Sequence, residues 1–272
     1  MNEKITIVMA IHDKNDCLEN TLTSIVKQNN FNNFNPFFIF VADGCSEEQD
    51  PLPIIETFFN KEKFLFHRNK ESIGFENLPS QFMKLIPSEI ENVVFQSCDV
   101  IWYDQNLLSK IVEKITNRAI EDSVIIPSPV LNLEIPEDVH KNKEEFFNLL
   151  KELTKDPSLY GEHKKPAYGY LAVIKKNNLK KVLDMRLYNS DGACDLVLKD
   201  HYAAAKINMV LMEAPIIHQK HFAIIYGCSS LSECTHPCTI RRTMVKKGMK
   251  FPFKIGYYNP KTNRWTDHPS YH

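Results

Sequence analysis

Short apolar runs alternate with longer amphipathic stretches over the first half of the chain. The apolar runs lie at residues 4–11, 36–42, 63–67, 93–97 and 123–127, and helical patterns lie between them at residues 15–28, 51–60, 76–86 and 104–118. Apolar runs of this length that alternate with helices are typical of buried parallel strands. The pattern predicts an α/β fold with a mainly parallel central sheet flanked by helices.

Three of these runs end in small polar residues that include an aspartate. The first run ends near Asp13, the second ends at Asp43 within the segment FFIFVADGCS, and the fourth leads to Asp99 within VVFQSCDV. In an open α/β sheet, ligands bind outside the carboxyl ends of the strands. We therefore expect Asp43 and Asp99 to point into one crevice, and we expect that crevice to be the functional site.

The rest of the chain continues the alternation less regularly. An amphipathic helix is expected around residues 146–153, a strand in the segment AYGYLAVIKK, helices near 177–184 and 195–205, and a strand in INMVLME. The sequence shows no internal repeat, low-complexity tract or interdomain linker. We predict one domain over residues 1–221 and a basic C-terminal extension over residues 222–272 that packs on the same domain.

Composition narrows the class of protein without defining it. Hydrophobic residues make up 43% of the chain and charged residues 25%, with a formal net charge of −1, as in an ordinary soluble domain. Seven cysteines with no signal peptide and no long apolar segment favour reduced thiols in the cytoplasm. The chain lacks Gly-x-Gly-x-x-Gly and Walker patterns, which argues against dinucleotide-binding and P-loop proteins. A nucleotidyltransferase is disfavoured because no glycine-rich loop follows the first strand.

Four segments, in this order, resemble the family 2 glycosyltransferases with the GT-A fold. They are ITIVMAIHDKNDCLENTLTSIVKQ, FFIFVADGCSEEQD, FQSCDVIWYDQNLL and GACDLVLKDHYAAAKINMVLMEAPIIH, and together they span roughly residues 4–221. They match the family's first strand and helix, its Asp-Asp-Gly-Ser turn, its Asp-x-Asp turn, and its Glu-Asp-x-Asp-Leu-x-x-Arg segment with a closing histidine. The resemblance implies transfer of a sugar, with inversion, from a nucleotide diphosphate sugar such as a UDP-sugar to a hydroxyl acceptor.

The resemblance also implies roles for individual residues. Asp43 would accept a hydrogen bond from the nucleobase, and Asp99 together with His218 would hold a divalent cation, Mn²⁺ or Mg²⁺, at the donor diphosphate. His221 is a second histidine candidate for the same task. The other residues at donor-binding positions are Ala10, His12, Ser97, Cys98 and Lys199. Both aspartates also have a purely structural explanation, because aspartate is common in turns and at strand ends.

Three acidic positions of the family are not acidic in this chain, where Ala42, Ser97 and Ala193 occupy them. The general base of such a transfer is a carboxylate that takes the acceptor's proton. Asp191 and Asp195 bracket the expected position, although Asp195 is equally explained as a helix cap. If neither serves, the protein is a catalytically degenerate one that binds sugar nucleotides or nucleic acid, and this is our second hypothesis.

The C-terminal segment carries two further patterns. Cys228, Cys234, His236 and Cys238 invite a zinc interpretation, but only the last two cysteines have a typical ligand spacing, so free thiols are the simpler explanation. The last 34 residues contain eight Lys and Arg against one Asp, interleaved with aromatic residues. This excess of charge favours an anionic acceptor, such as a glycan, a lipid-linked group or a hydroxylated DNA base. A solvated basic face is the plain alternative.

Overall fold

The computed structural model of the protein describes the residues that build its central sheet. The described residues are 5–12, 14–73, 77–134, 171–184, 202, 205–220, 256–259 and 264–267. The predicted helix around 146–153 lies outside them, as does most of the predicted helix near 195–205.

The described helices and strands follow the order that the apolar pattern predicts. In chain order they are β1 (Ile5–Ile11), α1 (Asn15–Val26), α2 (Phe31–Phe34), β2 (Phe37–Asp43), η1 (Glu47–Gln49), α3 (Leu52–Phe58), η2 (Lys61–Lys63), β3 (Phe64–Asn69), α4 (Leu78–Leu85), β4 (Asn92–Ser97), β5 (Val100–Ile101), α5 (Leu107–Thr116), β6 (Ser123–Glu134), β7 (Leu171–Lys175), α8 (Lys176–Asp184), β8 (Asn208–Lys220), β9 (Gly256–Asn259) and β10 (Arg264–Asp267). Each predicted strand and helix that falls on described residues is present near its expected bounds, except that β6 and β8 continue to Glu134 and Lys220, beyond their predicted ends at residues 127 and 213.

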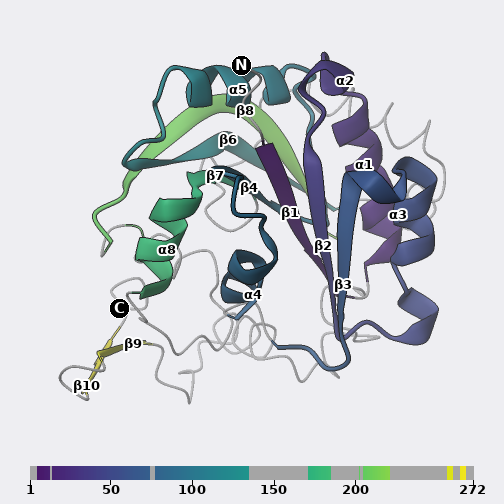
Figure 1. The fold of residues 1–272 in the computed structure, drawn as a ribbon, viewed down its shortest axis with the longest axis horizontal. Helices are drawn as coiled ribbons and strands as arrows, with labels where there is room; N and C mark the ends of the chain where they lie inside the picture. Colours follow the sequence, from purple (N-terminus) through teal and green to yellow (C-terminus); the bar gives the residue numbers. More distant parts are fainter. Residues whose placement is uncertain are drawn as a thin grey trace.

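The described strands β1 to β8 form one sheet in the order β3-β2-β1-β4-β7-β6-β8-β5. Strands β3, β2, β1 and β4 are parallel neighbours, and β6 and β8 are also parallel to each other. Strand β7 runs antiparallel to its neighbours β4 and β6, and β5 runs antiparallel to β8. The predicted mainly parallel sheet is therefore confirmed. In Figure 1 strands β1 to β3 run from the side of the N-terminus to the lower edge, where their carboxyl ends meet.

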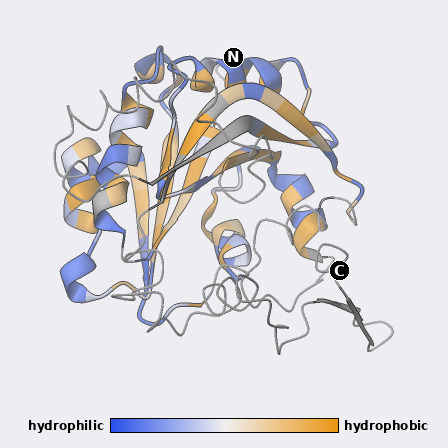
Figure 2. Ribbon diagram, turned by 180° about the vertical axis from the view of Figure 1, so that it is seen from behind, coloured by the Kyte–Doolittle hydropathy of each residue, from blue (hydrophilic) through white to orange (hydrophobic). Residues whose placement is uncertain are grey.

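Helices cover both faces of the sheet. Figure 1 shows α1 and α3 on one side of β1 to β3, and α4 and α8 on the other. The inner strands β1 and β2 are almost continuously apolar and buried rather than alternating, as expected when both faces of a sheet are covered. Figure 2 shows this concentration of apolar residues in the sheet. Aromatic side chains pack between β2 and α3. The ring of Phe38 in β2 and that of Phe59 at the end of α3 have centroids 4.3 Å apart.

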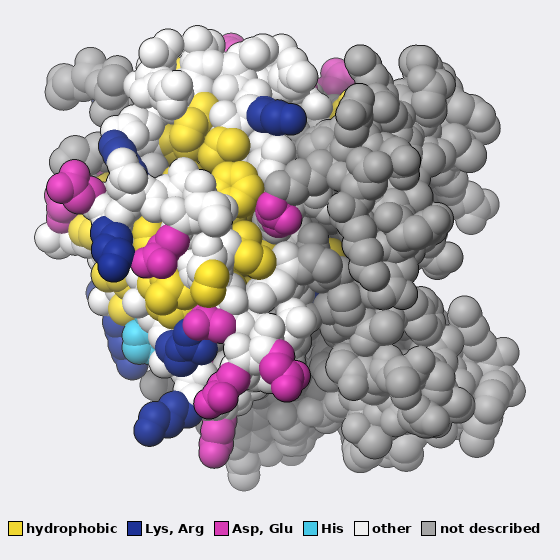
Figure 3. Space-filling model, turned by 90° about the vertical axis from the view of Figure 1, so that its right-hand side faces the viewer, with side chains coloured by type: hydrophobic (Ala, Val, Ile, Leu, Met, Phe, Trp, Pro, Cys, Tyr) yellow, Lys and Arg dark blue, Asp and Glu magenta, His cyan; other side chains and the backbone are white. Residues whose placement is uncertain are grey.

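The outer layer of α1 to α3 is amphipathic. Phe31, Phe34, Ile54 and Phe58 are partly buried and pack against the core from the outside. Figure 3 views the molecule from this side and shows apolar side chains at the surface between charged ones. Part of the apolar surface of these helices therefore remains exposed to solvent, while the strands beneath them are buried.

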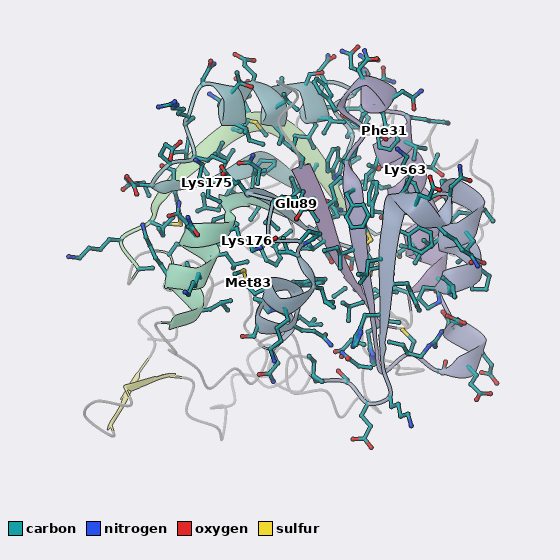
Figure 4. The ribbon with its side chains drawn as sticks, in the orientation of Figure 1. Phe31, Lys63, Met83, Glu89, Lys175 and Lys176 are labelled. Carbon is teal, nitrogen blue, oxygen red and sulfur yellow. The ribbon has the colours of Figure 1, made fainter. Side chains whose placement is uncertain are left out.

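The junction of β7 and α8 is fastened to the end of α4. Lys176 Nζ donates to the carbonyl oxygens of Ile86 at 3.2 Å and Pro87 at 2.9 Å. In Figure 4 Lys176 and Met83 of α4 are labelled in neighbouring positions. Lys175 pairs with Asn92 at the start of β4. This junction therefore lies at the end of the sheet that is opposite to the predicted site.

Three features differ from the sequence prediction. The two-residue strand β5 and the hairpin of β9 and β10 were not expected, because a segment of two to four residues is too short to show a period. Strand β8 continues to Lys220, so His218 does not end its strand as predicted but lies within it. The hairpin lies in a segment whose sequence pattern is weak, and Trp265 pairs there with Tyr258.

Candidate functional site

The carboxyl ends of β2 and β4 lie on either side of β1. Ala10, near the end of β1, is in register with Val41 of β2 and with Ser97 of β4. Neighbouring strands lie about 4.8 Å apart, so the residues that follow β2 and β4 are separated by roughly 10 Å. The structure therefore brings the predicted donor-binding segments together at one edge of the sheet.

Asp43, the last residue of β2, is almost fully buried, with 3% of its surface exposed. Its Oδ1 accepts hydrogen bonds from Asn69 Nδ2 at 2.8 Å and from the Ile73 backbone N–H at 2.9 Å. Its Oδ2 accepts a hydrogen bond from the Ser72 hydroxyl at 2.8 Å. A carboxylate offers about four lone pairs, and donors among the described residues use three of them, so a fourth can accept from a ligand.

The loop after β3 is folded around this carboxylate. Asn69 and Gln81 exchange two side-chain hydrogen bonds of 3.0 Å and 2.6 Å, which orient the Asn69 amide toward Asp43. Gly44 has a φ of +69°, and its backbone N–H donates to Asn69 O at 3.2 Å. A residue with a Cβ is strained at this φ, so glycine lets β2 turn directly beside the loop.

His12 projects from the end of β1 next to Asp43. Its ring Nδ1 is 2.6 Å from the Asp43 carbonyl oxygen, and the ring is exposed. Because a carbonyl oxygen only accepts, Nδ1 carries a proton in this bond. Cys45 Sγ donates to Ile11 O at 3.2 Å and holds the turn after β2 against the same strand end.

Asp99 lies in the turn between β4 and β5, and its side chain is 2% exposed. The Ser97 hydroxyl donates to its Oδ1, and the Lys14 ammonium forms an ion pair with its Oδ2. Lys14 is the residue before α1, and its side chain is 18% exposed. Ser97, at the first acidic position of the Asp-x-Asp turn that the sequence resembles, thus donates its hydroxyl to Asp99, and Lys14 supplies the opposite charge.

The two groups beside Asp99 have shifted pKa values. Burial alone lowers the pKa of the Lys14 ammonium, but the neighbouring Asp99 carboxylate outweighs it, so the pKa is raised and the lysine stays charged. Burial raises the pKa of the Cys98 thiol to about 12, with Lys14 opposing the shift. Cys98 is therefore a neutral thiol at physiological pH and no nucleophile.

A network of buried side chains holds the turn that carries Asp99. Gln96 Nε2 donates to Ser97 O at 2.8 Å and Val100 O at 2.9 Å, and Trp102 Nε1 donates to Gln96 Oε1 at 2.7 Å. The Thr21 hydroxyl of α1 donates to Cys98 O at 2.8 Å. The bonds to the carbonyl oxygens of Ser97, Cys98 and Val100 fix the backbone on both sides of Asp99, so the core determines the position of this carboxylate.

The predicted metal ligands Asp99 and His218 belong to segments that are neighbours in the sheet. The backbone of His218 in β8 pairs with that of Val100 of β5, one residue after Asp99, and a metal role for this pair stays a prediction. Among the residues that the structure describes, however, no three His, Cys, Asp or Glu side chains gather in a way that would hold a metal ion. The Asp99 carboxylate is already neutralised by Lys14, so its chemistry is that of an ion pair rather than of a vacant ligand.

The remaining predicted site residues lie outside the described part of the chain. These are the base candidates Asp191 and Asp195, the donor-binding Lys199, His221, and the cysteine and histidine cluster from Cys228 to Cys238. Their predicted roles stay predictions.

Sequence reasoning missed Lys14, Asn69 and Ser72. Lys14 directly precedes the helix predicted at 15–28, Asn69 lies two residues beyond the strand predicted at 63–67, and Ser72 lies in the loop after it, which has no apolar period. Only the positions of these residues could have marked them as site residues. Each lies just beyond the end of a predicted strand, on the edge of the sheet where ligands bind.

Comparisons with known proteins agree with this geometry at the level of the fold. No family model and no curated protein matches the chain. A mannosyltransferase from Pyrobaculum calidifontis, solved with GDP-Man and Mn²⁺, superposes with a TM-score of 0.53 at 14% identity, over 93% of this chain and 66% of its own. S. aureus TarS (residues 1–349), solved with UDP-GlcNAc, gives a TM-score of 0.54 at 15% identity, over 80% of this chain and 59% of its own. The chain has the GT-A fold.

The predicted resemblance to GT-A glycosyltransferases is confirmed in this sense. The chain spans 66% of the length of the mannosyltransferase structure and 59% of the TarS structure, so both contain parts that this chain does not share. In the described part of this GT-A chain, no helix has the length and apolar character needed to cross a membrane.

Proposed function

We propose that the protein is a glycosyltransferase that moves a sugar, with inversion, from a nucleotide diphosphate sugar to a hydroxyl acceptor. The observation that carries this proposal is the pair of anchored aspartates at one edge of a GT-A fold. Asp43 lies at the end of β2 and Asp99 just beyond the end of β4, with β1 between them. Ligands of open α/β sheets bind at this edge.

The geometry suits a nucleotide that lies across the strand ends. The base would lie at β2, where Asp43 has one acceptor position left after its three internal hydrogen bonds. An acceptor at this point favours a base that presents an N–H, and the uracil imide is such a base, so we propose a UDP-sugar as donor. His12 and the Ala10 backbone would border the nucleotide on β1, and the diphosphate would lie toward Ser97, Cys98 and Lys14.

The transfer itself is a single displacement. The acceptor oxygen forms a bond to the anomeric carbon, the bond from that carbon to the diphosphate oxygen breaks, and its electron pair stays on the leaving diphosphate. The acceptor's proton goes to a carboxylate base. We propose Asp191 or Asp195 for this base and Lys199 as a donor contact, on the sequence resemblance alone. No step is assigned to a metal, because Asp99 is already paired with Lys14.

The direct test is a screen of donors. We expect UDP and UDP-sugars to raise the melting temperature, because a ligand that binds only the folded state stabilises it by mass action. We also expect slow release of UDP from the donor without any acceptor, because water can replace the acceptor hydroxyl. Buffers with Mn²⁺, with Mg²⁺ and with EDTA are compared. A chain that neither binds nor hydrolyses any nucleotide sugar in all three would contradict the proposal.

A second candidate is a protein that binds sugar nucleotides without transferring the sugar. The observation that favours it is that both aspartates are engaged within the chain, Asp43 by a loop and Asp99 by Lys14. Ala42, Ser97 and Ala193 at acidic family positions agree with it. The same screen separates the two, because this protein would bind UDP-sugars with no hydrolysis and no transfer.

The basic C-terminal segment leads to a prediction about the acceptor. We propose that it faces an anionic acceptor, in which case acceptor binding should weaken steeply with salt, by a log–log slope of about −0.9 per phosphate neutralised on duplex DNA. Replacing Arg241, Arg242, Lys246 and Lys247 with alanine should flatten that slope. These residues lie outside the described ones. An unchanged slope in a folded variant would leave the segment as a solvated face.

A further inference from the structure

Lys14 occupies the position at the candidate donor site where a cation is required. It is the residue before α1, and its ammonium is bound to the Oδ2 of Asp99, which follows β4 at the carboxyl edge of the sheet. The Asp99 side chain is 2% exposed and the Lys14 side chain 18% exposed, so the lysine is the part of the pair that solvent, and hence a ligand, reaches. An ammonium has three N–H donors, and this ion pair uses one of them.

The ion pair and a divalent cation compete for the same carboxylate. Mg²⁺ binds oxygen ligands at about 2.0–2.1 Å, so a cation on Asp99 would lie within a few ångströms of the Lys14 nitrogen. At that distance two like charges repel strongly in a site of low polarity. The first acidic position of the Asp-x-Asp turn is occupied by Ser97, which adds no negative charge and donates its hydroxyl to Asp99. Among the described residues, the Asp99 carboxylate is thus paired with a positive charge from the chain itself, the Lys14 ammonium.

We propose that the Lys14 ammonium, held in place by Asp99, binds the diphosphate of the nucleotide sugar in place of a divalent cation, so that donor binding is independent of metal. This inference rests on the proposed function and names how its donor is held. Lysine is a well-suited phosphate ligand because it is a compact point charge with several donors. In the transfer, the ammonium stabilises the negative charge that the leaving diphosphate gains when the bond to the anomeric carbon breaks, and it keeps its own protons.

Calorimetric titration of the full-length protein with UDP tests the proposal. The wild type should bind UDP equally well in EDTA and in millimolar Mn²⁺. Lys14→Met should weaken UDP binding in EDTA by about 10- to 100-fold, the loss of a charge-assisted hydrogen bond. Lys14→Arg, which keeps the charge, should retain most of the affinity. Uridine, which has no phosphate, should bind the wild type and Lys14→Met alike.

The chain offers a matched control. Lys175 is 22% exposed and forms an ion pair with Glu121 at 2.7 Å, but it is the last residue of β7. It pairs there with Asn92 at the start of β4, and thus lies at the opposite edge of the sheet. Figure 4 labels this residue. Lys175→Met should leave UDP affinity unchanged. Lys14→Met leaves the buried Asp99 charge unpaired and could unfold the protein, so the double variant Lys14→Met with Asp99→Asn removes both charges and should show the same loss of UDP binding.

The outcomes separate the inference from the proposed function. UDP binding that appears only with Mn²⁺, or that survives both the single and the double variant in EDTA, overturns the role of Lys14 and leaves the glycosyltransferase proposal standing. Wild-type protein that binds neither UDP, GDP nor pyrophosphate in any buffer overturns both. Metal-independent binding that Lys14→Met abolishes and Lys175→Met does not supports both.

Discussion

Replacing Gly44 with alanine is expected to destabilise the protein by about 2–4 kcal/mol and to abolish most nucleotide binding. The φ of +69° costs an L-residue roughly 1–2 kcal/mol. An added Cβ would also lie 2.5 Å from the Ser72 backbone nitrogen and 2.9 Å from its Cα. These are backbone atoms, so the clash is relieved only by moving the loop whose Ser72 hydroxyl and Ile73 N–H bind Asp43.

Thermal unfolding and UDP titration measure the two effects of this change. The melting temperature should fall by about 5–15 °C, given roughly 2–4 °C per kcal/mol for a domain of this size. Arg118→Ala is the control, because Arg118 also has a positive φ of 56° but already carries a Cβ. It should leave stability and UDP binding nearly unchanged. If Gly44→Ala were as stable as the wild type, the loop after β3 would not be fixed against β2 as described.

The sequence predicted the sheet well because its signal is strong where burial is complete. Ile7, Phe38, Phe40 and Val94 are fully buried, and continuous apolar runs such as theirs cannot lie anywhere but in a covered sheet. The place of β7 was not predictable in the same way. Its apolar run gives no direction, and its antiparallel position between β4 and β6 depends on contacts such as that of Lys176 with the end of α4.

The candidate site was predictable in position but not in charge balance. The rule that ligands bind at the carboxyl ends of strands placed Asp43 and Asp99 at one edge, as observed. The residues that neutralise and hold these carboxylates come from other segments. Lys14 is 85 residues away from Asp99 in the chain and Ser72 is 29 away from Asp43. No local pattern marks such partners, because they are brought together only when α1 and the loop after β3 fold onto the strand ends.

Asp43 is the second residue at which we expect a large effect, and two substitutions separate its two roles. Asp43→Ala removes an acceptor from the Asn69 amide, the Ser72 hydroxyl and the Ile73 N–H together. Buried donors left without partners cost about 1–3 kcal/mol each, with incomplete additivity. We expect a loss of about 3–5 kcal/mol of folding free energy and no nucleotide binding, measured by denaturant unfolding and calorimetry.

Asp43→Asn keeps most of these bonds. The amide Oδ1 would still accept from Asn69 and Ile73, and the new Nδ2 would donate to the Ser72 hydroxyl, which can accept as well as donate. Stability should therefore stay within about 1–2 kcal/mol of the wild type, because only the charge of the acceptor is lost. The group that faces the nucleobase, however, changes from an acceptor to one that also donates.

The nucleobase is what makes this substitution informative. The uracil imide presents an N–H that a carboxylate accepts, whereas cytosine presents an acceptor at the same ring position. Asp43→Asn should weaken UDP binding by about 10- to 100-fold, the loss of a hydrogen bond to a charged group, and should shift the preference toward CDP. Calorimetric titration of both nucleotides against both proteins measures the shift. A stable Asp43→Asn protein with the wild-type preference for UDP would show that Asp43 only holds the loop after β3, and that the base is read by other residues.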